Sequence, residues 1–530
     1  MSFYLNQDNY GFASDKRYPL YVDKSLLIKE TNACFGIDQM KFMCVTRPRR
    51  FGKTMALKML NAYYSKGCDS KSLFEDMKIA DDPFFLSNLN KHNVLWIDMA
   101  GIYTDIDDKS NFIDEVKHEL ICALDEAYPG ILSENENTLR KAIVKVTEKT
   151  GERFVFLIDE WDVIYREEDG NRKLCDGYTE FLRSLFKSSD ASRCFDLVYM
   201  TGILPIRRYN TQSALNMFVE YNMLEPRGLA PHFGFTEGEV RSLCQEHGMD
   251  FPEIKSWYDG YKLGGLEVYN PKSVVEAMTL HKCGDYWVTT SATEAVANYM
   301  NFDGGFLKGT ITRLLAGESV RVNAGAFGND LSKVDSPDAA LTVLIHLGYL
   351  GFVPSDELNG TGLCFIPNRE ISQEFARAAQ ELDWNEVYSP LLKSKELYER
   401  TLLGDCAFIN STLDENHKDL ASHFNKNDEN LLSLIVQISY TYAKRLHPVD
   451  KEALSYRGRA DIVLRPGRND SFPWIIELKV DKSPEEAISQ IKERGYSECL
   501  HGYKGKVLLL GINYSTKEGK HSSMVEWIEI

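Results

Sequence analysis

The chain has 530 residues, of which 43% are hydrophobic and 26% are charged, and its formal net charge at pH 7 is −17. These proportions are ordinary for a globular protein, and no apolar run approaches the roughly 18 residues that a transmembrane helix needs, so we expect no membrane partner. The negative charge repels polyanions at long range, and any contact with nucleic acid must therefore use local basic patches.

Cysteine and histidine spacing excludes two further classes of protein. The eleven cysteines form no C-x-x-C pair and the eleven histidines form no H-E-x-x-H cluster, so neither a disulfide framework nor a zinc site is predicted. The first residues lack the basic and then apolar pattern of a secretory signal, and we expect a cytoplasmic location.

A chain of this length is too long for one hydrophobic core and should form several domains. Changes in residue pattern suggest four parts: an α/β domain at 1–225, a helical lid or winged-helix region at 226–380, a helical connector at 381–415 and a small α/β domain at 416–530. The expected fold class is therefore α/β multidomain.

Short apolar runs alternate with helical stretches in the first part. Runs that are apolar throughout are typical of strands buried on both faces, as in a parallel sheet. The predicted strands are Phe42–Val45, Val94–Ile97, Phe154–Ile158 and Leu197–Met200. The sequence therefore predicts a mainly parallel sheet.

A phosphate-binding loop (P-loop) is predicted directly after the first strand, at Arg47–Thr54. Such a loop needs backbone N–H groups at a helix N-terminus, a lysine for the phosphates and a hydroxyl for magnesium. Lys53 and Thr54 supply the last two, and a helix-forming run follows them. Arg47 stands where the usual G-x-x-x-x-G-K-[ST] motif has its first glycine. The candidate ATP-binding residues are Arg49, Arg50, Phe51, Gly52, Lys53 and Thr54.

A Gly-Lys-Thr sequence alone can be a chance match, but a second half of the site is present. The apolar strand Phe154–Ile158 ends in two carboxylates. Asp159 is predicted to bind Mg²⁺ together with Thr54, and Glu160 to orient the attacking water. The two halves together make ATP binding the preferred interpretation, and hydrolysis depends on whether the loop works without its first glycine.

Polar residues after the next strand give weaker signals. Thr201 could be a sensor beside the γ-phosphate or simply part of a strand-ending turn. Arg207 and Arg208 could contact the γ-phosphate, either within the chain or across the interface of a homo-oligomer, or could lie on a solvated face.

A second charged cluster is predicted in the C-terminal part, where the strands are near 460–464, 474–480 and 507–512, with a helix near 484–494. Asp461 lies on the first strand, and Glu477 and Lys479 emerge from one face of the second because strand side chains alternate. Two carboxylates and a lysine are the groups with which a Mg²⁺-dependent nuclease holds metal and positions water. The alternative is a solvent-facing Glu-x-Lys pair on an amphipathic strand.

Flanking residues add to the second cluster. Gln490 lies on the following helix and Tyr496 closes it, so both could reach the same site. Glu429 starts the helix before the first strand and could be a further ligand, or a first-turn glutamate favoured by the helix dipole.

With both clusters quoted, the chain resembles a bacterial family of AAA-ATPase-like proteins that carry a C-terminal nuclease domain of the PD-(D/E)XK superfamily. The N-terminal marks are Tyr21–Lys24, Arg47–Thr54, Leu157–Glu160 and Thr201–Gly202; the middle ones are Trp257–Tyr261 and Val268–Pro271; the C-terminal ones are Gly458–Asp461, Ile476–Lys479, Ala487–Gln490 and Tyr496. The resemblance implies an AAA/STAND-like P-loop ATPase sheet joined to a restriction-endonuclease-like fold, and it makes Arg47 a family trait.

The first functional hypothesis is an enzyme in which ATP controls a Mg²⁺-dependent nuclease that cleaves DNA, or less expectedly RNA, in genome defence or mobile-element biology. Glu160 would serve ATP hydrolysis, and Asp461, Glu477, Lys479 and Gln490 would serve cleavage, with Asp461 and Glu477 as metal ligands. An alternative is a nucleotide-switched binding or signalling protein that holds nucleic acid or a partner without cutting it. A third is an ATPase that remodels protein. Sequence preference, trigger and oligomeric state stay open.

Overall fold

The computed structural model describes residues 4–133, 136–206, 208–209, 212–213, 215–287, 296–301, 307–355, 360–421, 428–447, 449–455, 458–466, 471–495, 500 and 502–530. The chain forms two compact units, each built from two segments. The first unit comprises Met1–Trp287 and Arg321–Pro367, and the second comprises Val288–Val320 and Asn368–Ile530. The region 226–380 thus contributes to both units, and the four-part division stays a prediction.

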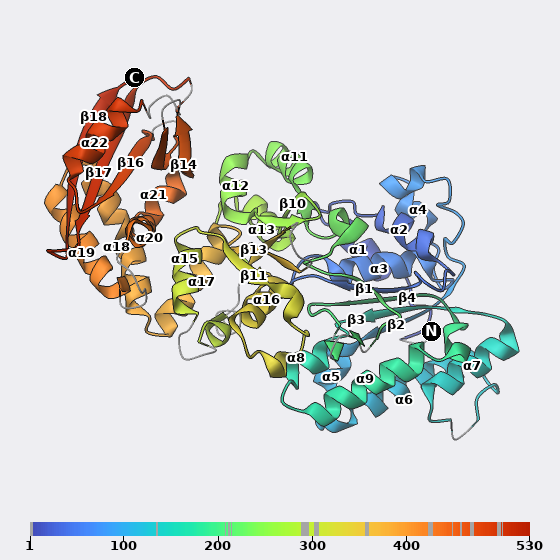
Figure 1. The fold of residues 1–530 in the computed structure, drawn as a ribbon. Coiled ribbons are helices and arrows are strands. Elements are labelled where there is room, and N and C mark those ends of the chain that lie inside the picture. Colours follow the sequence, from blue (N-terminus) through green and yellow to red (C-terminus); the bar gives the residue numbers. More distant parts are fainter. Residues whose placement is uncertain are drawn as a thin grey trace. The chain divides into compact units, whose positions relative to one another are not determined.

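A five-stranded parallel sheet forms the centre of the first unit, in the order β2-β3-β4-β1-β7 (Figure 1). Its strands are β1 (Phe42–Thr46), β2 (Asn93–Asp98), β3 (Phe154–Asp159), β4 (Phe195–Gly202) and β7 (Val219–Tyr221). The four predicted strands and their parallel arrangement are confirmed. The short edge strand β7 was not predicted.

Helices cover both faces of this sheet, which explains why its strands are apolar throughout. In β3, Val155 and Leu157 pack toward one hydrophobic cluster, whereas Phe156 and Ile158 pack toward the other. Figure 1 shows α3 on one face and α6 and α9 on the other. The main helices are α1 (Tyr10–Lys16), α2 (Leu27–Cys34), α3 (Lys53–Tyr64), α5 (Met99–Asp105), α6 (Phe112–Ala127), α7 (Leu139–Thr150), α8 (Val163–Glu167) and α9 (Arg172–Phe186).

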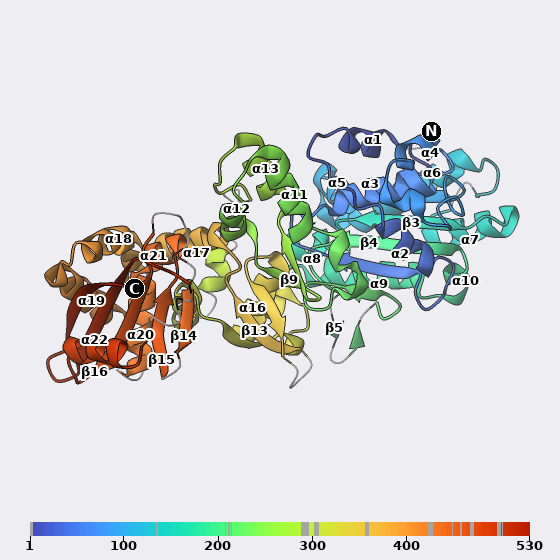
Figure 2. The same cartoon turned by 90° about the horizontal axis from the view of Figure 1, so that it is seen from above.

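The rest of the first unit combines helices with two three-stranded sheets, β8-β10-β9 and β11-β13-β12. Helices are present in this region, as predicted, but the sheets were not foreseen. Figure 2 shows α11–α13 apart from α16 and β13. The elements are β8 (Phe235–Thr236), α11 (Glu237–His247), α12 (Phe251–Tyr258), β9 (Tyr261–Leu263), β10 (Leu266–Tyr269), α13 (Pro271–Leu280), β11 (Val320–Asn323), α16 (Pro337–Leu347), β12 (Gly351–Pro354) and β13 (Thr361–Phe365).

The second unit contains a mixed sheet in the order β14-β15-β16-β17-β18, in which only β16 and β17 run parallel. Its strands are β14 (Val449–Ser455), β15 (Gly458–Leu464), β16 (Trp474–Val480), β17 (Lys506–Ser515) and β18 (Lys520–Glu529). Its helices are α15 (Lys308–Leu315), α17 (Arg369–Glu381), α18 (Asn385–Leu402), α19 (Cys406–Ala421), α20 (Glu429–Ser439), α21 (Thr441–Leu446) and α22 (Pro484–Glu493). None of the helices in the described ranges is long and apolar enough to cross a membrane.

Two kinds of contact fix helices to one face of the mixed sheet. Tyr398 of α18 stacks on Trp474 of β16 at a ring distance of 5.0 Å. On β18, buried His521 shares a 3.2 Å hydrogen bond with His417 of α19, and its Nδ1 lies 2.8 Å from Asp414 of the same helix. Burial lowers the pKa of His521 to about 4, despite the nearby Asp414. His521, which burial keeps neutral at physiological pH, therefore joins α19 to the sheet edge.

Candidate functional sites

The phosphate loop connects β1 to α3 with an unusual backbone. Arg50 has φ of 67° and Gly52, which caps α3, has φ of 87°. Left-handed residues in a short loop turn successive N–H groups inward, as in known anion-binding concavities. The helix N-terminus behind them adds a partial positive charge. The loop therefore suits a phosphate even though its first position is not glycine.

Arg47 explains why that first glycine is dispensable here. Its side chain is fully buried, and one guanidinium nitrogen donates 2.8 Å hydrogen bonds to the carbonyl oxygens of Thr46 and Tyr221. The guanidinium also lies 5.4 Å from the Phe233 ring. Burial lowers the pKa of Arg47 to about 10, so it remains charged at neutral pH. Arg47 thus joins the ends of β1 and β7 instead of facing the phosphates.

Asp159 is the centre of the polar cluster at the sheet edge. Thr54 Oγ1 donates to one of its carboxylate oxygens at 2.7 Å, and Thr201 Oγ1 donates to the other at 2.6 Å. The register explains this convergence, since Thr201 lies at the end of β4 between β1 and β3. Carboxylate and hydroxyl oxygens are the ligands that Mg²⁺ uses beside nucleotide phosphates, so Asp159 and Thr54 fit that ion.

Lys53 and Glu160 face the same edge. Lys53 is buried, and its ammonium donates to the carbonyl oxygens of Arg47 and Pro48, each at 3.1 Å. Burial lowers the pKa of Lys53. Glu160, at a φ of 50°, points its carboxylate to Arg166 of α8 at 2.5 Å. Burial raises the pKa of Glu160, and Lys53 opposes that shift.

Arg166 was not found from the sequence, nor was its second partner Asp162. Arg166 Nε lies 3.2 Å from the fully buried Asp162, which accepts from the backbone N–H groups of Ile203 and Leu204 at 3.0 and 2.7 Å. The available signal was a third carboxylate after Asp159 and Glu160, followed by an arginine one helical turn later. Such a pattern is common on solvated helices, and only the fold shows that it is buried.

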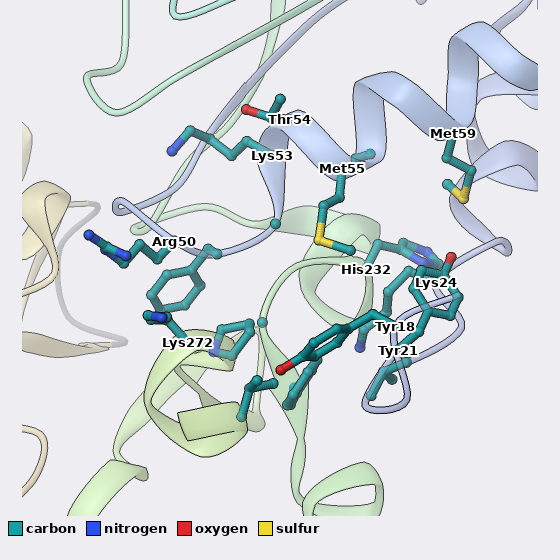
Figure 3. Close-up of a pocket in the computed structure, with 18 of the residues that line it drawn as sticks. Tyr18, Tyr21, Lys24, Arg50, Lys53, Thr54, Met55, Met59, His232 and Lys272 are labelled. Carbon is teal, nitrogen blue, oxygen red and sulfur yellow. The ribbon is translucent and has the colours of Figure 1, made fainter. Parts of the chain in front are cut away.

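A cavity of about 460 Å³ adjoins the phosphate loop (Figure 3). Lys53 and Thr54 lie at one end of it, and an apolar part is lined by Met55 and Met59 of α3. The segment Tyr18–Lys24 and residues near His232 and Lys272 complete its walls. A cleft of this size with an apolar part and few polar groups is typical of small-ligand sites. The Tyr21–Lys24 motif thus belongs to the cavity wall, a role that the sequence did not indicate.

Lys24 and His232 are two titratable groups in that wall. Lys24 donates to Glu239 at 2.6 Å and to the Pro231 carbonyl at 2.9 Å, so its ammonium is already paired. Burial and the neighbouring Lys24 lower the pKa of His232 to about 4. His232 is therefore a neutral hydrogen-bonding group at physiological pH.

The second cluster lies on the mixed sheet. The ladder pairs Ile462 of β15 with Ile476 of β16, which brings Asp461 opposite Glu477. One Asp461 oxygen accepts from the Leu478 N–H at 2.7 Å. Opposed residues of an antiparallel pair have Cβ atoms about 5 Å apart. Their two carboxylates therefore share one face of the sheet.

Glu477 and Lys479 are buried, with only 2% and 8% of their surface exposed. Lys479 Nζ lies 2.7 Å from Glu477 Oε1, and Gln490 of α22 donates to the same oxygen. Burial, followed by the Asp461 charge, raises the pKa of Glu477 to about 7. The alternative of a solvent-facing pair is wrong, because α22 covers this face.

Gly511 of β17 permits that cover. It pairs with Glu477, and a Cβ at this position would lie 2.4 Å from the Pro484 carbonyl oxygen and 3.1 Å from Ala487. Since α22 begins at Pro484, only glycine lets the helix approach closely enough to bring Gln490 to Glu477.

Some predicted residues do not join these clusters. Arg207 and Tyr496 lie outside the described residues, as does the side chain of Arg208. Arg49 and Arg50 are exposed at the mouth of the first site. Glu429 is exposed in the first turn of α20, which Asp428 caps. Within the described ranges, no group of three or more His, Cys, Asp or Glu side chains is placed to hold a metal, so an ion at the second site would rest on two carboxylates and other oxygens.

Comparisons with known proteins match a separate family model to the region of each of the two sites. Residues 11–211 match the family model described as predicted AAA-ATPase, and residues 429–524 match that of the PD-(D/E)XK nuclease superfamily. The chain therefore combines an AAA-ATPase-like domain with a C-terminal domain of the PD-(D/E)XK nuclease superfamily, and the resemblance seen in the sequence is confirmed.

Two individual proteins are also similar. An uncharacterized protein in the vnfD 5′ region of Azotobacter chroococcum mcd 1 is 23% identical over 527 residues, which cover 95% of this chain and 97% of the relative. A solved structure of the Aeropyrum pernix ORC2 protein in ADPNP and ADP complexes covers 70% of this chain and 93% of that chain, at 10% identity and a TM-score of 0.30. That likeness is too distant to add to the fold described above.

Proposed function

We propose that the chain binds and hydrolyses ATP at the first site and that ATP controls a Mg²⁺-dependent nuclease at the second, with DNA rather than RNA as substrate. The observation that carries the nuclease proposal is the burial of Glu477 and Lys479 as a paired group on the face that also holds Asp461. Burying charges is costly, and buried charged groups with perturbed pKa values cluster at functional sites.

The residues present fit a divalent ion at the second site. Glu477 Oε2 is buried and has no hydrogen-bond partner among the described residues, and a cation between it and Asp461 would remove that cost. Bound Mg²⁺ supplies a Lewis acid that neutralises charge on a scissile phosphate. Lys479 would hold the attacking water or stabilise the developing negative charge, while Gln490 keeps the Glu477 carboxylate oriented.

At the first site, the proposal assigns each polar group one task. Lys53 and the loop N–H groups would bind phosphates, and Thr54 and Asp159 would hold the Mg²⁺ that accompanies ATP. Glu160 would orient the attacking water, and Thr201 fixes the Asp159 carboxylate. Arg49, Arg50 and Phe51 line the cavity.

Cleavage assays test the nuclease. The full chain is incubated with DNA and RNA, with and without ATP, in Mg²⁺ or Mn²⁺. Glu477→Gln should abolish cleavage, because it removes the charge that would bind metal while keeping the side-chain size. Glu485→Ala, at an exposed first-turn position of α22, is the matched control and should cleave like the wild type. Equal cleavage by Glu477→Gln would refute the assignment.

A second candidate is a nucleotide-switched binding protein that does not cleave. The observation in its favour is that Lys479 and Gln490 already satisfy Glu477 Oε1. Calorimetric titration with Mn²⁺ separates the candidates. A nuclease site should bind the ion in the wild type and lose it in Glu477→Gln, whereas a docking module should give the same titration for both.

A further inference from the structure

The phosphate loop is held from outside by residues of 234–348. The Trp287 indole N–H donates to the Arg49 carbonyl oxygen at 3.2 Å, and the Gly234 N–H donates to the Phe51 carbonyl oxygen at 3.2 Å. The Phe51 ring meets the Tyr261 ring edge-on, at 5.3 Å and 86°. Three contacts thus reach two loop residues, and all of them lie within the first unit.

Gly348 and Tyr261 extend this set of contacts. Gly348 caps α16 with a φ of 89°, and a Cβ on it would lie 2.7 Å from the Pro48 ring. Tyr261 is 1% exposed, and its hydroxyl donates to the Gly348 carbonyl oxygen at 2.7 Å. Tyr261 therefore contacts the loop through Phe51 and also fixes the turn that packs on Pro48.

These contacts have an energetic consequence for ligand binding. A loop that is already ordered loses less conformational entropy when it binds, which favours affinity. Arg47 replaces the first glycine and is used to join β1 and β7. From outside the loop, the positions between Arg47 and Gly52 are thus contacted by Trp287, Tyr261, Gly234 and Gly348, and from within it by Lys53.

One of the contacting residues lies where the chain leaves the first unit, and a second such point lies beside the Gly260–Tyr261 turn. Trp287 is the last residue of the first segment of unit 1, and Pro367 is the last residue of its second segment. Gly260, next to Tyr261, has a φ of 105°, and a Cβ there would lie 2.1 Å from the Pro367 carbonyl oxygen. A shift of the loop would therefore be felt directly at 287 and, through the Gly260–Tyr261 turn, at 367.

We propose that Trp287 and Tyr261 are positioning residues of the phosphate loop, and that through them the nucleotide state of the loop biases the chain at both of these crossing points. This inference rests on the proposed ATP site and gives its control over the second unit a physical route. It also assigns a task to the Trp257–Tyr261 motif, whose last residue meets the loop.

Three conservative variants of the full chain test the proposal. Trp287→Phe removes the indole N–H but keeps an aromatic ring beside Tyr349, and Tyr261→Phe removes only the hydroxyl. Tyr258→Phe is the matched control, because Tyr258 belongs to the same motif and its hydroxyl donates to the Gly284 carbonyl oxygen and accepts from the Gly284 N–H, each at 2.9 Å. Affinity for ATP is measured by calorimetry, and backbone order at 47–52 by hydrogen exchange. Thermal melting identifies any variant that does not fold.

We expect Trp287→Phe and Tyr261→Phe each to weaken ATP binding about five-fold, the effect of one buried hydrogen bond, and to speed exchange at 47–52. At saturating ATP, Trp287→Phe should also reduce the ratio of cleavage rates with and without ATP. Tyr258→Phe should match the wild type in ATP affinity, in exchange at 47–52 and in the ratio of cleavage rates.

Other outcomes separate the two proposals. Wild-type affinity, exchange and ATP response in both loop variants would overturn this inference and leave the proposed function standing. A wild-type chain that binds no ATP would overturn both. If ATP binds to the wild type but does not alter cleavage, control of the nuclease by ATP fails, and so does its route through Trp287. The ATP affinities of the two loop variants then still decide whether Trp287 and Tyr261 position the phosphate loop.

Discussion

Asp159 and Glu477 are both strand carboxylates, but their surroundings differ. Asp159 receives hydrogen bonds from two hydroxyl groups beside a cavity of about 460 Å³. Glu477 lies under α22 and is paired with Lys479 and Gln490. Asp159 is therefore left to meet charge that a ligand brings, whereas Glu477 carries its own cation. Disturbing the groups around Asp159 should thus affect ligand turnover, whereas removing the partner of Glu477 should affect folding.

Among these predictions, Lys479→Met should give the largest effect, a loss of folding stability. If stability did not fall, the contrast between the surroundings of Asp159 and Glu477 would be wrong. The substitution leaves Glu477 buried without its cation; breaking a buried pair costs up to about 3 to 5 kcal/mol, less the part that Glu477 recovers by taking up a proton at its raised pKa. Calorimetric unfolding of the full chain measures the loss. The double variant Glu477→Gln with Lys479→Met should recover most of the stability. A single variant as stable as the wild type would show that the pair is exposed in solution.

Arg166→Met tests the first site. Without Arg166, Glu160 loses the 2.5 Å contact that orients it, and misplacement of a catalytic group by about 1 Å can cost ~100-fold in rate. We expect kcat for ATP hydrolysis to fall by that order while KM changes little. Arg183→Met, which removes an exposed pair with Glu180 on α9, should leave kcat unchanged. A matching rise in KM would instead assign Arg166 to nucleotide binding.

Arg47→Gly restores the usual loop motif but should weaken the protein. It leaves the Thr46 and Tyr221 carbonyl groups without their buried donor and opens a cavity, a loss of about 2 kcal/mol. Thermal melting measures this, with Arg50→Gly, at an exposed left-handed position of the same loop, as the control. A gain in ATP affinity without loss of stability would mean that Arg47 is a defect of the loop.

His521 gives the smallest expected effect. Its pKa is lowered from 6.5 to about 4 in the fold, so the unfolded chain binds the proton more readily, and stability is lost as pH falls below 6.5 toward 4. Between pH 7.5 and 5.5 this amounts to about 1 kcal/mol. Unfolding measured at both values should show this loss, and His521→Gln should reduce it. An unchanged pH dependence in the variant would exclude His521 as its source.

The sequence predicted what depends on local pattern. Uninterrupted apolar runs located four strands of the parallel sheet, and alternation placed Glu477 and Lys479 on one face. It could not show that α22 covers that face, because this depends on Gly511, far along the chain. The contacts of Arg47 were missed for the same reason, as was the burial of Asp162, the partner of Arg166. The partners Tyr221 of Arg47 and Leu204 of Asp162 meet these side chains only once the sheet has formed.

Each unit of this protein is assembled from two segments that are separated in the sequence. During synthesis, residues 288–320 emerge before any part of 368–530, so they must wait for most of their unit to be made. The first unit is likewise incomplete when residue 287 has emerged, because Gly348 and the strands β12 and β13 are still missing. The first unit can therefore finish folding only after residues 288–320 of the second have been made, and the second only after the whole of the first. A cut at residue 287 would release a fragment whose phosphate loop lacks the Gly348 turn that packs on it.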